Sequence, residues 1–175
     1  MNQKITFGIA LFGLFLGVLI AIVFGVNESF FKDRIQKGLQ KNIKIQAMAD
    51  PIKKQAKLTK EASKNWRYYQ RFHFHSTGIG AMSLGILILL LYIAAPTSAK
   101  VVSAYAISLG GFFYPFIWLF AAIYGPEMGR HQAKECFAVF GYMGGVFLLG
   151  ILLTMVLLFK YELKLPKHES MINDK

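Results

Sequence analysis

The chain has 175 residues, of which 55% are apolar and 15% aromatic, and its formal charge is +11. A nucleic-acid-binding protein could have this charge, but it would not need four apolar runs that are each long enough, as a helix, to cross the roughly 30 Å of hydrocarbon in a bilayer. The lone Cys136 excludes an internal disulfide and any zinc or iron–sulfur site built from cysteines. We therefore expect one all-α, polytopic membrane domain with four transmembrane helices and no nucleic-acid partner.

The first predicted span covers residues 5–26, behind a short polar start. A secretory signal peptide begins in the same way, but its apolar core is usually about 7–15 residues long and ends at a small-x-small cleavage site. This run is longer and no such site follows it, so we expect it to stay in the membrane. Gly13 and Gly17 lie one turn apart, a spacing that lets a second helix approach closely.

The connector of residues 27–71 carries twelve of the 20 Lys and Arg residues. Apolar residues recur among these cations at four-residue spacing, which predicts a basic amphipathic helix able to lie in the plane of the lipid headgroups. These residues are Phe31, Ile35, Leu39 and Ile43. We interpret the connector as a solvated, lipid-facing segment attracted to anionic headgroups. A dedicated surface for a protein partner is the alternative.

Asp50 and Pro51 have the pattern of an N-cap and a first helical residue, so a second helix is expected to start there and can continue into the second span. The three later spans are predicted at residues 74–94, 101–124 and 136–159. The connection between the second and third spans is short, which makes them an antiparallel hairpin.

Proline and glycine mark the last two spans. Pro115 predicts a kink, because proline removes a backbone hydrogen bond and clashes with the preceding turn, and Gly125-Pro126 is expected to end the third span. Small-residue pairs that permit close packing are Gly110-Gly111 and Gly141 with Gly145.

The distribution of Lys and Arg predicts the orientation, because cytoplasmic loops are enriched in these residues. The twelve in the connector, with Arg130 and Lys134 in the loop after the third span, make fourteen on one side. Lys4, Lys100 and four residues of the tail make six on the other. We expect a bacterial inner (plasma) membrane protein with both large loops in the cytoplasm, both termini outside, and a polar, solvated tail that includes His168.

This topology gathers five ionisable residues at the cytoplasmic rim, namely Glu28, His73, His75, Glu127 and His131. Ionisable groups in or beside a membrane are candidates for function, because desolvating them is unfavourable. Residues two apart on a regular helix point about 200° away from each other, so we expect only one of His73 and His75 to face the bundle interior. We predict that this is His75, because it lies deeper in the span.

The sharpest functional hypothesis is a b-type haem at this rim. His75 and His131 would be its axial ligands, since neutral imidazoles from facing helices are a usual way to hold haem iron. His73, Arg71 and Arg130 would then meet the haem propionates, because arginine pairs well with carboxylates.

Other sites use the same residues. A copper, zinc or iron ion would take His73, His75, His131 and Glu28, because imidazole and carboxylate suit these metals. A quinone head group would take His75 and Glu28. Without any cofactor, the histidines would anchor helix ends by hydrogen bonds to headgroups and backbone.

The stretch Phe72-His73-Phe74-His75, followed by Gly78 and Gly80 and a long aliphatic run, resembles a known motif. It is similar to the H-x-H helix entrance of small bacterial membrane proteins associated with b-haem and haem–copper respiratory chemistry. The resemblance covers the second span, and Ser76-Thr77 stands where those families often have a polar or Asn position. The resemblance implies a redox-linked role in the membrane.

We therefore expect a small subunit of a redox or respiratory assembly that works with other membrane subunits or as a homo-oligomer. A stand-alone enzyme is not expected, because the sequence lacks the usual motifs of ATP hydrolysis, zincin proteolysis and serine-esterase chemistry. A structural accessory or assembly subunit is the second expectation. A small-solute transporter or channel is the third, although the spans hold no charged residue near their midpoints.

Overall fold

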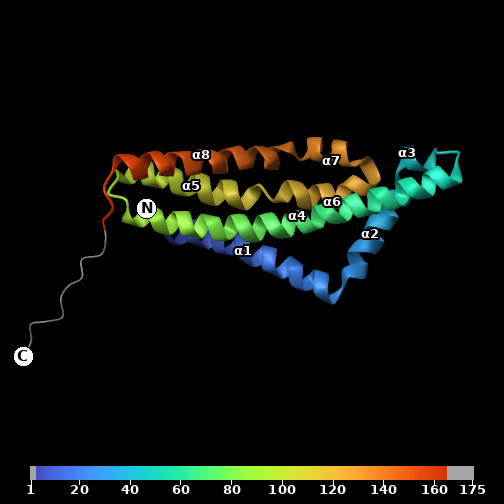
Figure 1. Ribbon diagram of the computed structural model, residues 1–175, viewed down its shortest axis with the longest axis horizontal. Coiled ribbons are helices and arrows are strands. Elements are labelled where there is room, and N and C mark those ends of the chain that lie inside the picture. The colour runs from blue at the N-terminus through green and yellow to red at the C-terminus, as the bar shows by residue number, and fades with distance from the viewer. Residues whose placement is uncertain (1–2, 165–175) are drawn as a thin grey trace, which may run out of the picture.

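The computed structural model describes residues 3–164 as a bundle of helices (Figure 1). Within these residues the one non-helical pairing is an isolated antiparallel bridge between Ile93 and Leu163. The prediction of an all-α chain is confirmed for this part of the chain. The tail from residue 165, including His168, and residues 1–2 lie outside the described residues. The helices are α1 (Gln3–Val26), α2 (Glu28–Lys41), α3 (Ile43–Gln46), α4 (Pro51–Tyr92), α5 (Thr97–Phe113), α6 (Phe116–Met128), α7 (Arg130–Cys136) and α8 (Ala138–Lys160).

Four segments of the described chain are long and apolar enough to cross a membrane: α1, α4, the α5–α6 pair and α8. They correspond to the four predicted spans. Large apolar side chains lie on their outer faces, such as Phe15 on α1 and Leu149 on α8, which are 55% and 65% exposed. An extended apolar face of this kind is suited to hydrocarbon and unsuited to water.

α4 is one continuous helix of 42 residues. The Asp50 carboxylate caps it by accepting hydrogen bonds from the backbone N–H groups of Ile52 and Lys53 at 2.9 and 3.1 Å, and Pro51 occupies the first turn. The predicted start of this helix and its continuation into the second span are confirmed. Its polar first half extends beyond the apolar bundle, where α2 and α3 pack against it (Figure 1).

α4 also forms the centre of the bundle. α1, α5 and α6 all pack against it, α1 also contacts α5, and α8 packs on α5 (Figure 1). The α1–α2 and α6–α7 turns lie at the same end of the molecule, which we call the basic end and which comprises residues 27–71 and 125–137. At the other end, the N–H of Ala94 donates to the carbonyl of Glu162 at 2.9 Å and holds the end of α8 to the α4–α5 turn.

Glycines allow the closest helix contacts. A Cβ on Gly17 would lie 2.7 Å from the backbone nitrogen of Thr77, and a Cβ on Gly110 would lie 2.5 Å from that of Phe147. α1 and α4, and likewise α5 and α8, therefore meet at very short range, as the glycine patterns predicted for the first and third spans. The second G-x-x-x-G differs, because a Cβ on Gly145 would have no atom within 4 Å, whereas one on the neighbouring Gly144 would meet the Tyr114 ring.

The third apolar segment is interrupted at Pro115, where the sequence predicted a kink, since α5 ends at Phe113 and α6 begins at Phe116. The prediction that Gly125-Pro126 ends the segment is wrong, because α6 continues through both residues to Met128. Tertiary packing accounts for the difference. Gly125 lies against Asn65, and the Pro126 ring lies against Gly38. The helix ends at Gly129, whose φ is +98°.

α2 corrects the interpretation of the connector. Its apolar side does not face headgroups, because Phe31, Ile35 and Leu39 are buried against α4 and α6. The four-residue spacing fails at its last member, since Ile43 is 82% exposed. Asn42 interrupts the helix directly before it, so the buried position passes to Ile45.

Candidate functional site

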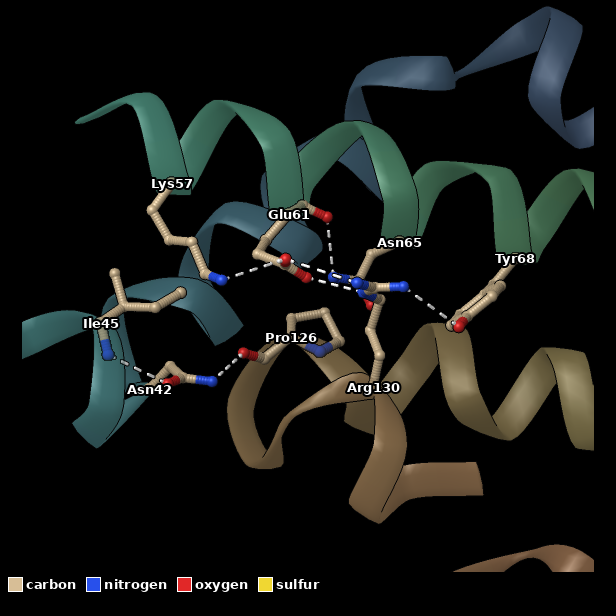
Figure 2. A network of polar contacts seen from close by, with 8 residues as sticks. All are labelled: Asn42, Ile45, Lys57, Glu61, Asn65, Tyr68, Pro126 and Arg130. Carbon is tan, nitrogen blue, oxygen red and sulfur yellow. Dashed lines mark hydrogen bonds and ion pairs between the residues drawn. The ribbon is translucent and has the colours of Figure 1, made fainter. Parts of the chain in front are cut away.

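A polar network at the basic end joins α4 to α7 (Figure 2). At its centre, Nε of Arg130 donates to Oε2 of Glu61 at 2.7 Å, and Nη2 donates to Oε1 at 3.4 Å. Nη1 of Arg130 reaches the Tyr68 hydroxyl at 3.5 Å. The side chains of Glu61 and Arg130 are 13% and 27% exposed. The network is therefore built on a partly buried, two-point ion pair between segments far apart in the chain.

Local sequence explains why these two side chains meet. Glu61 is the single acidic residue of α4 and lies among seven Lys and Arg residues in the stretch 51–71. Arg130 is the first residue of α7 and directly follows Gly129. The positive φ of Gly129 is a conformation that favours glycine, and it turns the chain so that Arg130 reaches back to α4 (Figure 2).

Opposing effects act on the pKa of Glu61. Burial would raise it, but the hydrogen bond and charge of Arg130, together with the charges of Lys57 and Lys64, bring this pKa below its ordinary value of 4.5. The hydrogen bond to Glu61 raises the pKa of Arg130 in turn, against the effect of burial. Both groups are charged at neutral pH, so the ion pair is present there.

Asn42 holds a second corner of the same network (Figure 2). Its Oδ1 accepts a hydrogen bond from the backbone N–H of Ile45 at 3.2 Å, and its Nδ2 donates to the carbonyl of Pro126 at 3.0 Å. The Asn42 side chain thus caps α3 and ties it to the end of α6. This accounts for the burial of an asparagine that is only 8% exposed.

A cavity of about 940 Å³ opens between these elements at the basic end. α3, the polar half of α4 and the α6–α7 segment line it, together with Leu39 of α2. Its cationic side chains are Lys44, Lys57, Arg130 and Lys134. A cavity of this size is large enough for a small organic molecule, for which sites of about 300–1,000 Å³ are usual.

His73 and His75 both contact neighbouring groups, on different sides of α4. Nδ1 of His73 lies 2.8 Å from the carbonyl oxygen of Gly17 on α1, and Nδ1 of His75 lies 2.8 Å from that of Arg71. A carbonyl oxygen can only accept, so the hydrogen bond requires the proton on Nδ1, and in the neutral form of each ring Nε2 then keeps its lone pair. The His75 ring also lies against Tyr114 and Trp118. We expected only one imidazole to face the bundle, but both do. His73 contacts α1, and His75 contacts Tyr114 and Trp118 on the third apolar segment, because α4 is packed against helices on more than one side.

His131 and Glu28 have other contacts. The His131 side chain is 86% exposed, and its Nδ1 lies 3.2 Å from Oε2 of Glu135 on the same helix. Glu28 is exposed and pairs with Lys32 at 3.1 Å. His75 contacts Arg71, Tyr114 and Trp118, whereas His131 contacts Glu135. Among residues 3–164, no group of three or more His, Cys, Asp or Glu side chains is close enough to hold a metal ion.

Each predicted haem ligand and propionate partner already contacts a neighbouring group within residues 3–164. Arg130 is engaged by Glu61, and the Arg71 guanidinium lies over the ring of Trp118, 4.8 Å from its centroid. The bis-histidine haem between His75 and His131, the redox role and the resemblance that implied it stay predictions.

Sequence reasoning missed Glu61 and Asn42. For Glu61 the sequence contained a signal, because it is the single carboxylate among seven cations on one helix. Such a residue is a candidate for an ion pair, including one with a distant arginine. For Asn42 the signal was weaker, since an asparagine after an amphipathic stretch marks only a helix boundary. Both lie in the connector that we interpreted as solvated.

No protein-family model matches the chain, and no curated protein or solved structure is significantly similar to it. Its function is therefore inferred from its own residues and their geometry.

Proposed function

We propose that the protein is an accessory subunit of a larger membrane assembly. In this proposal its four apolar segments cross the bacterial inner (plasma) membrane, and the basic end lies in the cytoplasm. The observation that carries the proposal is the burial of the apolar side of α2, where Phe31, Ile35 and Leu39 are 6%, 2% and 1% exposed. The connector is thus a folded part of the protein, and its cations are held outward.

Two features support the membrane part of the proposal. The outer faces of α1 and α8 carry large exposed apolar side chains, which hydrocarbon accommodates without penalty. The connector and the α6–α7 turn, which together hold fourteen of the 20 Lys and Arg residues, lie at the same end of the bundle. An excess of cations at one end favours that end in the cytoplasm.

The basic end has the properties of a docking surface. Ten of the twelve Lys and Arg side chains in residues 27–71 are exposed, against four acidic residues in the same stretch. α2 presents Arg34, Lys37 and Lys41 on its outer side. A surface whose backbone is already ordered loses less conformational freedom when it binds. These cations are therefore suited to bind an acidic patch on a partner subunit, close to the anionic lipid headgroups.

Native electrophoresis of membranes dissolved in a mild detergent tests this proposal at the natural expression level. We expect the wild-type chain to migrate in a species larger than the chain alone, and the combined substitution Arg34→Gln, Lys37→Gln and Lys41→Gln to release it. The matched control, Lys160→Gln with Lys164→Gln at the opposite end, is expected to keep the complex. Migration of the wild-type chain as a monomer would contradict the proposal.

A second candidate is a redox subunit in which His75 holds a haem or metal ion together with a ligand from a partner. The observation that favours it is the Nδ1 hydrogen bond of His75 to the Arg71 carbonyl, which leaves Nε2 with its lone pair. Metal-ligating histidines use this arrangement, because the bond on one nitrogen orients the other. Such a group would supply one-electron chemistry when bound.

An absorption spectrum of the reduced, natively isolated assembly separates the two candidates. The redox candidate predicts a Soret band with sharp α and β bands that His75→Ala removes and His131→Ala leaves in place. A colourless, metal-free assembly that contains the intact chain would rule out the redox candidate and leave the accessory role.

A further inference from the structure

The cavity at the basic end is lined by two chemically different kinds of side chain. The cations are Lys44, Lys57, Arg130 and Lys134, which come from α3, α4 and α7. The apolar side chains are chiefly Leu39, Ile45, Met48 and Met128. A ligand that contacts both kinds needs an anionic group and an apolar or weakly polar portion.

The cationic side chains of the cavity outnumber its carboxylates, four against two. Glu61 is shared by two of the cations, since it lies 2.7 Å from Arg130 and 3.7 Å from Lys57. Glu135, the other carboxylate, lies 3.2 Å from His131, an imidazole that is charged only when protonated. Within residues 3–164, Lys44 and Lys134 have no ion-pair partner. Two ammonium groups are therefore available to an anion.

Arg130 is oriented before any ligand arrives. Three of its five N–H donors are directed to Glu61 and Tyr68, which fixes the plane of the guanidinium (Figure 2). One N–H remains on each of Nη1 and Nη2. A guanidinium held in this way can offer two donors to a phosphate group without losing further rotamer freedom, and arginine suits phosphate geometry.

We propose that this cavity binds an organic phosphate. The phosphate group contacts Arg130, Lys44 and Lys134, and the organic portion contacts the apolar side chains of the lining, such as Ile45 and Met48. A phosphorylated lipid headgroup and a soluble phosphate ester present the same chemistry to these residues. The residues that line the site do not include Arg34, Lys37 or Lys41, so the site does not depend on the partner subunit proposed above.

Binding to the full-length chain in detergent micelles tests the site, with phosphatidic acid doped into the micelles in one arm and glycerol 3-phosphate in solution in the other. Native mass spectrometry measures the first arm, with phosphatidylcholine as the neutral reference lipid, and titration calorimetry measures the second. Lys44→Gln and Lys134→Gln are the test variants, because each removes one cation and neither side chain is in an ion pair within residues 3–164. Lys60→Gln on the same end, outside the cavity, is the matched control.

We expect each test variant to weaken binding about tenfold, the loss of one charge-assisted contact, while the control changes it less than about twofold. Saturable binding in the lipid arm alone identifies a headgroup, and binding in the soluble arm identifies a phosphate ester; either result supports the site. The proposal is overturned if neither probe binds, or if Lys44→Gln, Lys134→Gln and Lys60→Gln weaken binding equally.

Discussion

The guanidinium of Arg130 and the carboxylate of Glu61 come from positions 69 residues apart and meet through two hydrogen bonds. They join α7 to the polar first half of α4, which extends beyond the apolar bundle (Figure 1). With the Asn42 bond to Pro126, this pair holds the basic end in one conformation.

Glu61→Gln is expected to destabilise the protein. The amide cannot neutralise Arg130, which stays partly buried, and the loss is about 1–3 kcal/mol, the usual range for a charged group that loses its partner. Thermal unfolding in detergent micelles measures the effect. Glu28→Gln is the control, because the exposed Glu28–Lys32 pair contributes at most about 0.5 kcal/mol. Equal melting temperatures for wild type and Glu61→Gln would show that the pair does not hold the helices together.

Acid is expected to weaken the same contact. The folded protein lowers the pKa of Glu61 below its ordinary value of 4.5, so the folded state binds the proton less tightly than the unfolded state does. The stabilisation is therefore complete above about pH 4.5 and is lost as the pH falls through the lower pKa of the folded state. Melting temperatures recorded across this window are expected to fall more steeply for wild type than for Glu61→Gln. Parallel curves would contradict this assignment.

Gly110→Ala is expected to push α5 and α8 apart. The new Cβ would lie 2.5 Å from the backbone nitrogen of Phe147, and backbone cannot move aside as a flexible side chain can. We expect a loss of about 1–3 kcal/mol, as for other overpacked positions. Gly145→Ala on α8 is the control, since no atom lies within 4 Å of that Cβ. A melting temperature for Gly110→Ala at or above that of the control would refute the close contact.

His73→Ala is expected to loosen α1 from α4. It removes the Nδ1 hydrogen bond to the Gly17 carbonyl, a loss of about 1 kcal/mol, the typical net contribution of one hydrogen bond. His131→Ala, an exposed position, is expected to change stability little. Limited proteolysis at the α1–α2 turn is a second readout, because a looser α1 exposes that turn more often. If both variants behave alike, the His73 bond has no structural role.

Apolar patterning predicted the helices well, because a long apolar run that begins behind a polar start or a proline has few alternatives to a helix of that length. The Asp50 cap and an interruption of the helix at Pro115 followed from local chemistry, and the structure contains both. The continuation of α6 through Pro126 did not follow, because it depends on Asn42 and Gly38, residues more than 80 positions away. Local rules contain no information about such partners.

The same limit explains the connector. A face formed by Phe31, Ile35 and Leu39 has the same pattern whether it meets lipid or protein, and only the arrangement of α4 and α6 decides between them. The histidines show the converse. Topology predicted Glu28, His75 and His131 toward the same end, but a shared end does not decide which side chains meet. His75 lies against Tyr114 and Trp118, midway along the third apolar segment, and His131 lies beside its helical neighbour Glu135.

The account depends most on four membrane crossings with the basic end in the cytoplasm, and labelling of single cysteines in intact cells tests this directly. In a Cys136→Ser background, Lys60→Cys reports on the basic end and Ser98→Cys on the α4–α5 turn, both at exposed positions. We predict that a membrane-impermeant maleimide labels Ser98→Cys in intact cells and labels Lys60→Cys only after the membrane is opened. Labelling of both positions in intact cells would contradict the account.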